Sequence, residues 1–167
     1  MTDAVRCTAR GEKVIDPEDV PTPTDARLAD GQYADHWVLC ESERAKGYVR
    51  PVRESYVHVG PVGPKFQLRD LTAEEQERFS DNGYVKFETY PAGFKGSSTG
   101  RFWTQEQLDK VGKGCGTLTR MPIACAETYA REPGYYGSTF CCGCGDYFKV
   151  GAAGEFVWDG TYERVGT

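Results

Sequence analysis

The chain has 167 residues, of which 39% are hydrophobic and 13% aromatic, and its formal net charge is −5. This composition supports a single modest hydrophobic core and excludes a largely disordered chain. The acidic balance opposes nonspecific binding to DNA or RNA, and no stretch approaches the roughly 18 apolar residues that a membrane helix needs. Residues 1–10 are polar and do not read as a secretory signal, so a cytoplasmic protein without a membrane partner is expected.

The N-terminal part differs in amino-acid composition from the rest of the chain. Residues 16–25 combine three prolines with several acidic residues, and large apolar side chains are few before residue 34. This predicts an extended acidic arm over residues 1–33, followed by one zinc-stabilised domain over residues 34–167. Short runs rich in valine and aromatic residues then predict strands at residues 36–40, 48–52 and 54–59, and a rigid turn at residues 60–64.

Two capping patterns predict helix starts in the middle of the chain. Thr72 is followed three residues later by Glu75, which predicts a helix that runs to about Ser80 and stops before Gly83. A strand is expected over residues 84–90, and a loop rich in glycine and serine over residues 92–100.

The second pattern is Thr104 with Gln107, which predicts a short helix that ends near Gly112. Apolar positions spaced by three and four residues predict another helix over residues 121–131. Three glycine-separated strands are expected after it, at residues 138–142, 146–150 and 155–158. The prediction is an α+β fold, a small mixed domain of short strands and two to three short helices, with a zinc-ribbon-like C-terminal half.

The cysteines indicate a metal site. Seven cysteines are an odd number, and Cys141 and Cys144 form a C-x-x-C motif followed by Gly145. Such a knuckle brings two thiolates onto one tetrahedral ion, while the glycine permits the left-handed turn after it. Reduced thiols that bind metal are therefore favoured over disulfides.

Structural zinc takes four ligands, so two more are needed. Cys115 is the best third ligand because Gly114 and Gly116 flank it, and His58, at the end of a predicted strand, is the best fourth. The predicted cofactor is a structural Zn²⁺ ion. Cys142, which could replace Cys141, and Cys125, which lies on the apolar stripe of a predicted helix, remain alternatives.

No catalytic residues are predicted. The sequence contains neither H-E-x-x-H nor the H-x-E and P-C-x-x-C pair of nucleobase deaminases, which would supply a base beside an open zinc site. A structural metal and a non-enzymatic function are therefore favoured. The alternative is a zinc-dependent enzyme in which an ordered water replaces His58 as the fourth ligand.

A basic segment over residues 44–69 is the candidate partner-binding region. It places Arg44, Arg50 and Arg53 among Tyr48 and Tyr56, and arginines interleaved with aromatic rings can hold phosphates and stack bases. A nucleic-acid-associated factor is therefore a second functional alternative. Neighbouring glutamates also allow this segment to be an ordinary solvated surface.

Five motifs in the chain are similar to segments of a known group of proteins: RPVRESYVHVG, AETYAR, YGSTFCCGC, EFVWDG and ERVGT. Over residues 37–167 the sequence resembles a group of short zinc-knuckle proteins of tailed bacteriophages and metagenomic phage contigs, to which no activity is assigned. The resemblance implies a phage origin and supports the four proposed ligands as a set. Since phage accessory proteins commonly act by binding a host protein, the expected function is binding of a host protein in the host cytoplasm, with inhibition of that protein as one option.

Overall fold

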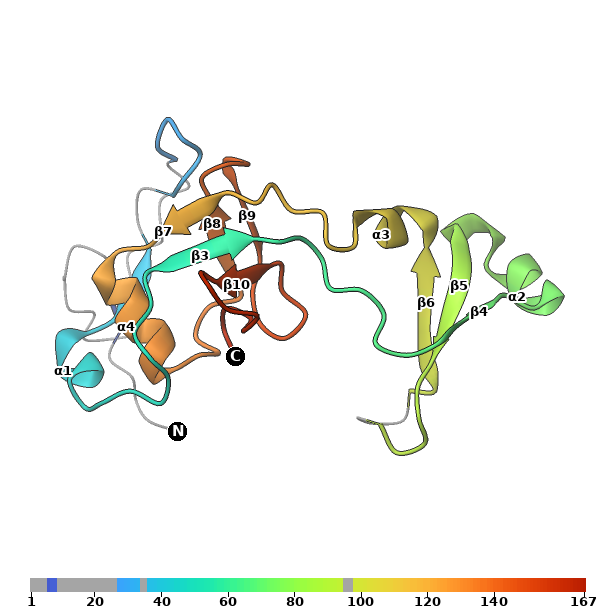
Figure 1. Ribbon diagram of the computed structural model, residues 1–167, viewed down its shortest axis with the longest axis horizontal. Helices are drawn as coiled ribbons and strands as arrows, with labels where there is room; N and C mark the ends of the chain where they lie inside the picture. The colour runs from blue at the N-terminus through green and yellow to red at the C-terminus, as the bar shows by residue number, and fades with distance from the viewer. Residues whose placement is uncertain (1–5, 9–26, 34–35, 95–97) are drawn as a thin grey trace. The chain divides into compact units, whose positions relative to one another are not determined.

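The computed structural model describes residues 6–8, 27–33, 36–94 and 98–167, so most of the predicted N-terminal arm lies outside the described residues. The chain divides into two compact units. The larger unit comprises Met1–Val59 and Gly114–Thr167, and the smaller unit comprises Gly60–Lys113. Both contain helices and antiparallel strands, which confirms the expected α+β class (Figure 1). Within the described part of the chain, no helix has the length and apolarity needed to cross a membrane.

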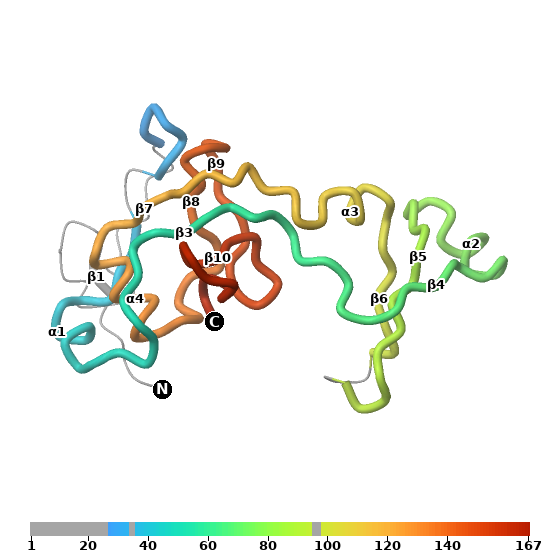
Figure 2. The backbone as a smooth tube through the Cα atoms, in the orientation of Figure 1, coloured from blue at the N-terminus to red at the C-terminus, as the bar shows by residue number. Residues whose placement is uncertain are grey.

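The larger unit is built around a three-stranded antiparallel sheet in the order β10-β3-β7. These strands are β3 (Ser55–His58), β7 (Leu118–Arg120) and β10 (Phe156–Trp158). They come from three distant parts of the chain, as their green, orange and red colours show in Figure 2. Two pairs of strands complete the unit: β1 (Arg6–Thr8) with β2 (Trp37–Leu39), and β8 (Ser138–Cys141) with β9 (Asp146–Lys149).

The core of the larger unit lies on one face of this sheet. Burial alternates along β3, so Tyr56 and His58 point into the interior. Helix α4 (Ile123–Arg131) packs there through Ala126 and Tyr129, both of which are almost fully buried. The predicted helix over residues 121–131 is confirmed, with its start moved to Ile123 because Pro122 takes the N-cap position in an extended conformation.

For the larger unit, one local prediction is wrong and one short helix was not predicted. Residues 48–52 form no strand, because the amides of Val49 and Arg50 both donate to the carbonyl of Ala130, at 2.8 and 3.0 Å, near the end of α4. The short helix α1 (Glu41–Arg44) was not expected. It is held against α4 by an ion pair of 2.5 Å between Arg44 and Glu127.

The smaller unit contains a second antiparallel sheet in the order β4-β5-β6. Its elements are β4 (Leu68–Asp70), α2 (Ala73–Arg78), the 3-10 helix η2 (Ser80–Asn82), β5 (Tyr84–Thr89), β6 (Gly100–Thr104) and α3 (Gln105–Lys110). Both predicted capping boxes are confirmed, at Thr72 with Glu75 and at Thr104 with Gln107. Strands β4 and β6 were not predicted from the sequence.

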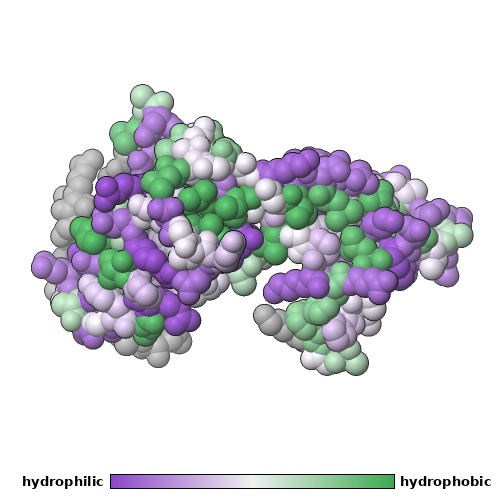
Figure 3. All heavy atoms as spheres, in the orientation of Figure 1, coloured by the Kyte–Doolittle hydropathy of each residue, from purple (hydrophilic) through white to green (hydrophobic). Residues whose placement is uncertain are grey.

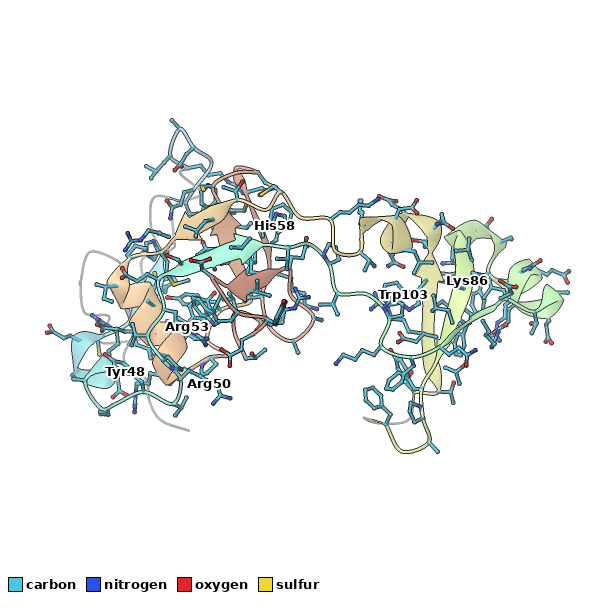
Figure 4. All side chains as sticks on the ribbon, in the orientation of Figure 1. Tyr48, Arg50, Arg53, His58, Lys86 and Trp103 are labelled. Atoms are coloured by element: carbon cyan, nitrogen blue, oxygen red, sulfur yellow. The ribbon has the colours of Figure 1, made fainter. Side chains whose placement is uncertain are left out.

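One buried carboxylate organises the smaller unit. Glu88 is 3% exposed, and it accepts hydrogen bonds from the backbone amides of Lys65 and Phe66 and from the indole of Trp103. Figure 4 shows Trp103 on the sheet of this unit. Three N–H donors therefore compensate the negative charge of this buried carboxylate.

Candidate metal centre

Four side chains of the larger unit converge at one end of its sheet. The donor atoms of His58, Cys115, Cys141 and Cys144 all lie within 4.8 Å of one another. These are the four residues that the sequence analysis named as ligands. They come from the end of β3, the segment before β7 and the turn between β8 and β9, so the group joins three separate parts of the chain.

Backbone pairing explains why Cys115 lies beside His58. The amide of Gly116 donates to the carbonyl of His58 at 2.9 Å, and the amide of His58 donates to the carbonyl of Thr117 at 3.4 Å. These bonds continue the pairing of β3 and β7 beyond the end of β7, so that the residues before Leu118 lie beside His58. Gly116 has a φ of +70°, a left-handed conformation that favours glycine, and this directs the chain at Cys115 toward the cluster.

The C-x-x-C turn is shaped by two glycines. Gly145, with a φ of +67°, donates its amide to the carbonyl of Cys141 at 2.8 Å and closes the turn. A Cβ atom at Gly143 would lie 2.4 Å from the hydroxyl of Thr117 and 3.0 Å from the sulfur of Cys115. Glycine is therefore required at position 143 for the turn to approach Cys115.

The spacing of the donors fits one tetrahedral ion. The sulfurs of Cys115 and Cys141 are 3.3 Å apart, and the sulfur of Cys144 lies 3.5 Å from Nδ1 of His58. A zinc–sulfur bond of about 2.3 Å places two sulfurs of a tetrahedral site about 3.8 Å apart. A disulfide would need about 2.05 Å, and all four thiols of this region are free.

The imidazole of His58 is held in one orientation. Its ring is 4% exposed and stacks on Phe148 with a centroid distance of 4.3 Å. Nε2 lies 3.1 Å from a carboxylate oxygen of Glu155, while Nδ1 faces Cys144. A carboxylate on the far nitrogen is the usual support of a metal-binding histidine, because it fixes the tautomer and the ring plane. Glu155 was not predicted in this role, because only the pairing of β3 with β10 brings it close to His58.

The clustered thiols perturb one another electrostatically. Hydrogen bonding from Thr117 lowers the pKa of Cys115 to about 6, whereas desolvation, followed by the neighbouring Cys115 and Cys141 thiols, raises the pKa of Cys144 to about 12. Burial also raises the pKa of Cys141, against the effect of the Cys144 and Gly143 amides that point at its sulfur. Three thiolates this close repel each other, and a bound cation removes that repulsion.

The alternative ligands lie outside this group. Cys142 is exposed and faces away, with its sulfur 3.3 Å from the hydroxyl of Thr119. Cys125 is buried on α4, where desolvation raises its pKa to about 11. The thiol of Cys40 is buried 3.2 Å from the hydroxyl of Ser42. Cys7 lies on β1, and its side chain is outside the described part of the chain.

The residues of the basic segment do not share one surface. Tyr56 is 2% exposed, and its hydroxyl donates to the carbonyl of Phe140, so it offers no face to a nucleobase. Arg44 is used in its ion pair with Glu127, and Arg53 pairs with Glu163 and lies over the ring of Trp158. Only Tyr48 and Arg50 are exposed, on the segment that leads to β3 (Figure 4).

The fold and the four donors together define an α+β protein with a three-cysteine, one-histidine group that could hold a metal ion. In comparisons with known proteins, no family model, curated protein or solved structure matches this chain.

Proposed function

We propose that this chain is a non-enzymatic binding protein whose larger unit is stabilised by a structural Zn²⁺ ion. The observation that supports the proposal is the convergence of four donor atoms, from His58, Cys115, Cys141 and Cys144, within 4.8 Å. Three sulfurs and one imidazole nitrogen are a donor set that suits zinc. Four protein ligands complete a tetrahedron and leave no position for a substrate, which is typical of a structural site.

The position of the donors supports a role in folding. The zinc ion would join β3, the segment before β7 and the β8–β9 turn, which local structure alone does not bring together. Metal affinity then becomes part of the folding free energy. Because Cys115 and Cys144 are exposed while His58 and Cys141 are buried, an ion can reach the site from solvent and still contact the core.

Metal analysis of the purified protein tests the site. We expect about one equivalent of zinc in the native chain and a loss of most of it in Cys144→Ser. The matched control is Cys142→Ser, which changes an exposed thiol two residues away that lies outside the donor group. Less than half an equivalent of zinc in the native chain, or equal zinc content in both variants, would contradict the proposal.

The binding function is proposed for an exposed stretch of the larger unit, residues 48–52. Tyr48 and Val49 are 46% and 62% exposed, and the neighbouring Arg50 is exposed too. Figure 3 shows hydrophilic and hydrophobic residues intermixed on the visible face of the molecule. The backbone here is held by the two hydrogen bonds to Ala130, so a partner would meet an already ordered segment.

In accordance with the resemblance to phage proteins, the proposed partner is a host protein. Tyrosine and arginine carry much of the binding energy of protein interfaces, which favours this stretch over the paired arginines elsewhere. Affinity capture from a bacterial lysate with the native chain should recover one specific protein, and Tyr48→Ala with Arg50→Glu should lose it. Capture that is identical with both chains, or that disappears after nuclease treatment, would contradict a host-protein partner at this site.

A further inference from the structure

A cavity of about 250 Å³, partly open to solvent, lies in the larger unit, apart from the four donor residues. Its lining residues come from β3, β7, α4, β8 and β9 and from outside these elements, where they include Asp30, Gln32, His36 and Met121. An apolar cavity of about 150 Å³ is large enough to bind benzene, so this one has room for one or two fused rings. Part of its lining, including Tyr56, Met121 and Tyr129, is buried and packed, so the shape of that part is set by the core, whereas Asp30 and Arg120 are exposed.

The lining of the cavity includes four tyrosines and one phenylalanine, together with the half-buried imidazole of His36. Among the lining side chains are those of Tyr56, Met121, Tyr129 and Phe140. The carboxylate of Asp30 and the guanidinium of Arg120, which also line it, belong to exposed residues. A fully charged ligand would lose its hydration without gaining a buried partner, whereas an uncharged planar ring gains contact with aromatic walls.

Most hydroxyl groups of the walls are already used. The hydroxyl of Tyr56 donates to the carbonyl of Phe140 at 2.5 Å and accepts from Thr139 at 3.3 Å. The hydroxyl of Tyr136, another lining residue, donates to the carbonyl of Trp37 at 2.5 Å. These bonds fix the two rings in place and leave neither proton for a ligand.

Tyr129 differs from these tyrosines. The residue is 3% exposed, and among the described residues its hydroxyl has no hydrogen-bond partner of normal geometry. Burial acts most strongly on the pKa of this hydroxyl, and a contact with the Thr139 hydroxyl lowers it; Thr139, Tyr56 and Cys125, the groups that act on it, all line the cavity. Burial raises its pKa above the ordinary range, so the phenol keeps its proton as a donor at neutral pH. A buried donor without a partner is destabilising, and a ligand acceptor would satisfy it.

We infer that this cavity binds a small uncharged heteroaromatic molecule of one or two rings, with a ring nitrogen or carbonyl oxygen that accepts a hydrogen bond from Tyr129. The aromatic rings of the walls favour a planar ligand. The phenol of Tyr129 favours a ligand with a hydrogen-bond acceptor at the edge of its ring. The inference is independent of the metal, because none of the four donors lines the cavity.

The test uses the full chain with its metal, at about pH 8, and three probes: quinoline, 3-methylpyridine and toluene. The last two match in size and shape and differ only in the ring nitrogen that accepts a hydrogen bond. Titrations followed by amide NMR should give shifts centred on Met121, Cys125, Tyr129 and Thr139. Tyr129→Phe removes the donor and should weaken both nitrogen-containing probes about fivefold while leaving toluene unchanged.

The variant removes one oxygen atom from an unpaired group, so the fold should be retained. Its zinc content and melting temperature are measured in the same samples, which separates a failure of this inference from a failure of the proposed metal site. Absence of binding by all three probes up to about 10 mM would overturn the inference, as would shifts confined to other parts of the chain. Equal affinities of the native chain and Tyr129→Phe for 3-methylpyridine would also overturn it.

Discussion

We expect removal of the proposed Zn²⁺ ion to unfold the larger unit. A metal that joins Cys115 to Cys141 closes a loop of 26 residues, and one that joins His58 to Cys144 closes a loop of 86. In the chain-entropy model of a cross-link these closures contribute about 3.5 and about 4.6 kcal/mol. Their sum, about 8 kcal/mol, is an upper limit, yet it equals the whole stability of many domains, which is about 5–15 kcal/mol.

The assay is thermal unfolding and amide NMR before and after chelation, with the metal content measured at each step. We expect the chelated chain to lose the cooperative transition and the signal dispersion of residues 36–59 and 114–167. The signals of residues 60–113 should change less, because none of the four donors lies in the smaller unit. Restoring zinc should restore the spectrum.

The two serine variants separate metal loss from other effects of the chelator. Cys144→Ser should behave like the chelated protein, and Cys142→Ser should behave like the native chain. If a sample with less than about a tenth of an equivalent of metal kept its thermal unfolding transition and its NMR spectrum, the metal would not be what holds the larger unit folded. The larger unit would then be stable through its hydrophobic core alone.

Three further predictions concern other contacts. Glu155→Ala should weaken zinc binding about 10–100-fold in a chelator competition, because His58 loses the partner that orients it, and an unchanged affinity would contradict this role. The ion pair with Arg69 and the capping bonds from Thr72 lower the pKa of Glu75 to about 2, below its ordinary 4.5. The stability from Glu75 is therefore present above about pH 4.5 and is lost as the pH falls toward 2, and Glu75→Gln should reduce this acid dependence in the NMR signals of residues 60–113. Thr128→Val should cost about 1–3 kcal/mol in urea unfolding, because a buried amide of β2 loses its acceptor, whereas Thr128→Ser, which keeps the hydroxyl, should cost less.

Features that depend on neighbouring residues could be predicted from the sequence. The capping boxes at Thr72 and Thr104 require only a hydroxyl and a glutamate or glutamine three residues later, and both are present. The C-x-x-C motif with its glycine supplies two of the four donor residues through local geometry alone. By contrast, the strand predicted at residues 48–52 was wrong because its amides bond to Ala130, which is distant in sequence.

The α+β class, the capped helices and the knuckle at Cys141 and Cys144 could be predicted because each depends on chemistry within a few residues. Three features result from tertiary contacts instead: Glu155 lies beside His58, Cys125 and Cys142 lie apart from the four donors, and Tyr56 is buried. Such arrangements depend on the pairing of β3 with β7 and β10, strands that lie far apart in the chain. Long-range pairing is set by the packing of the whole core, and no local pattern records it.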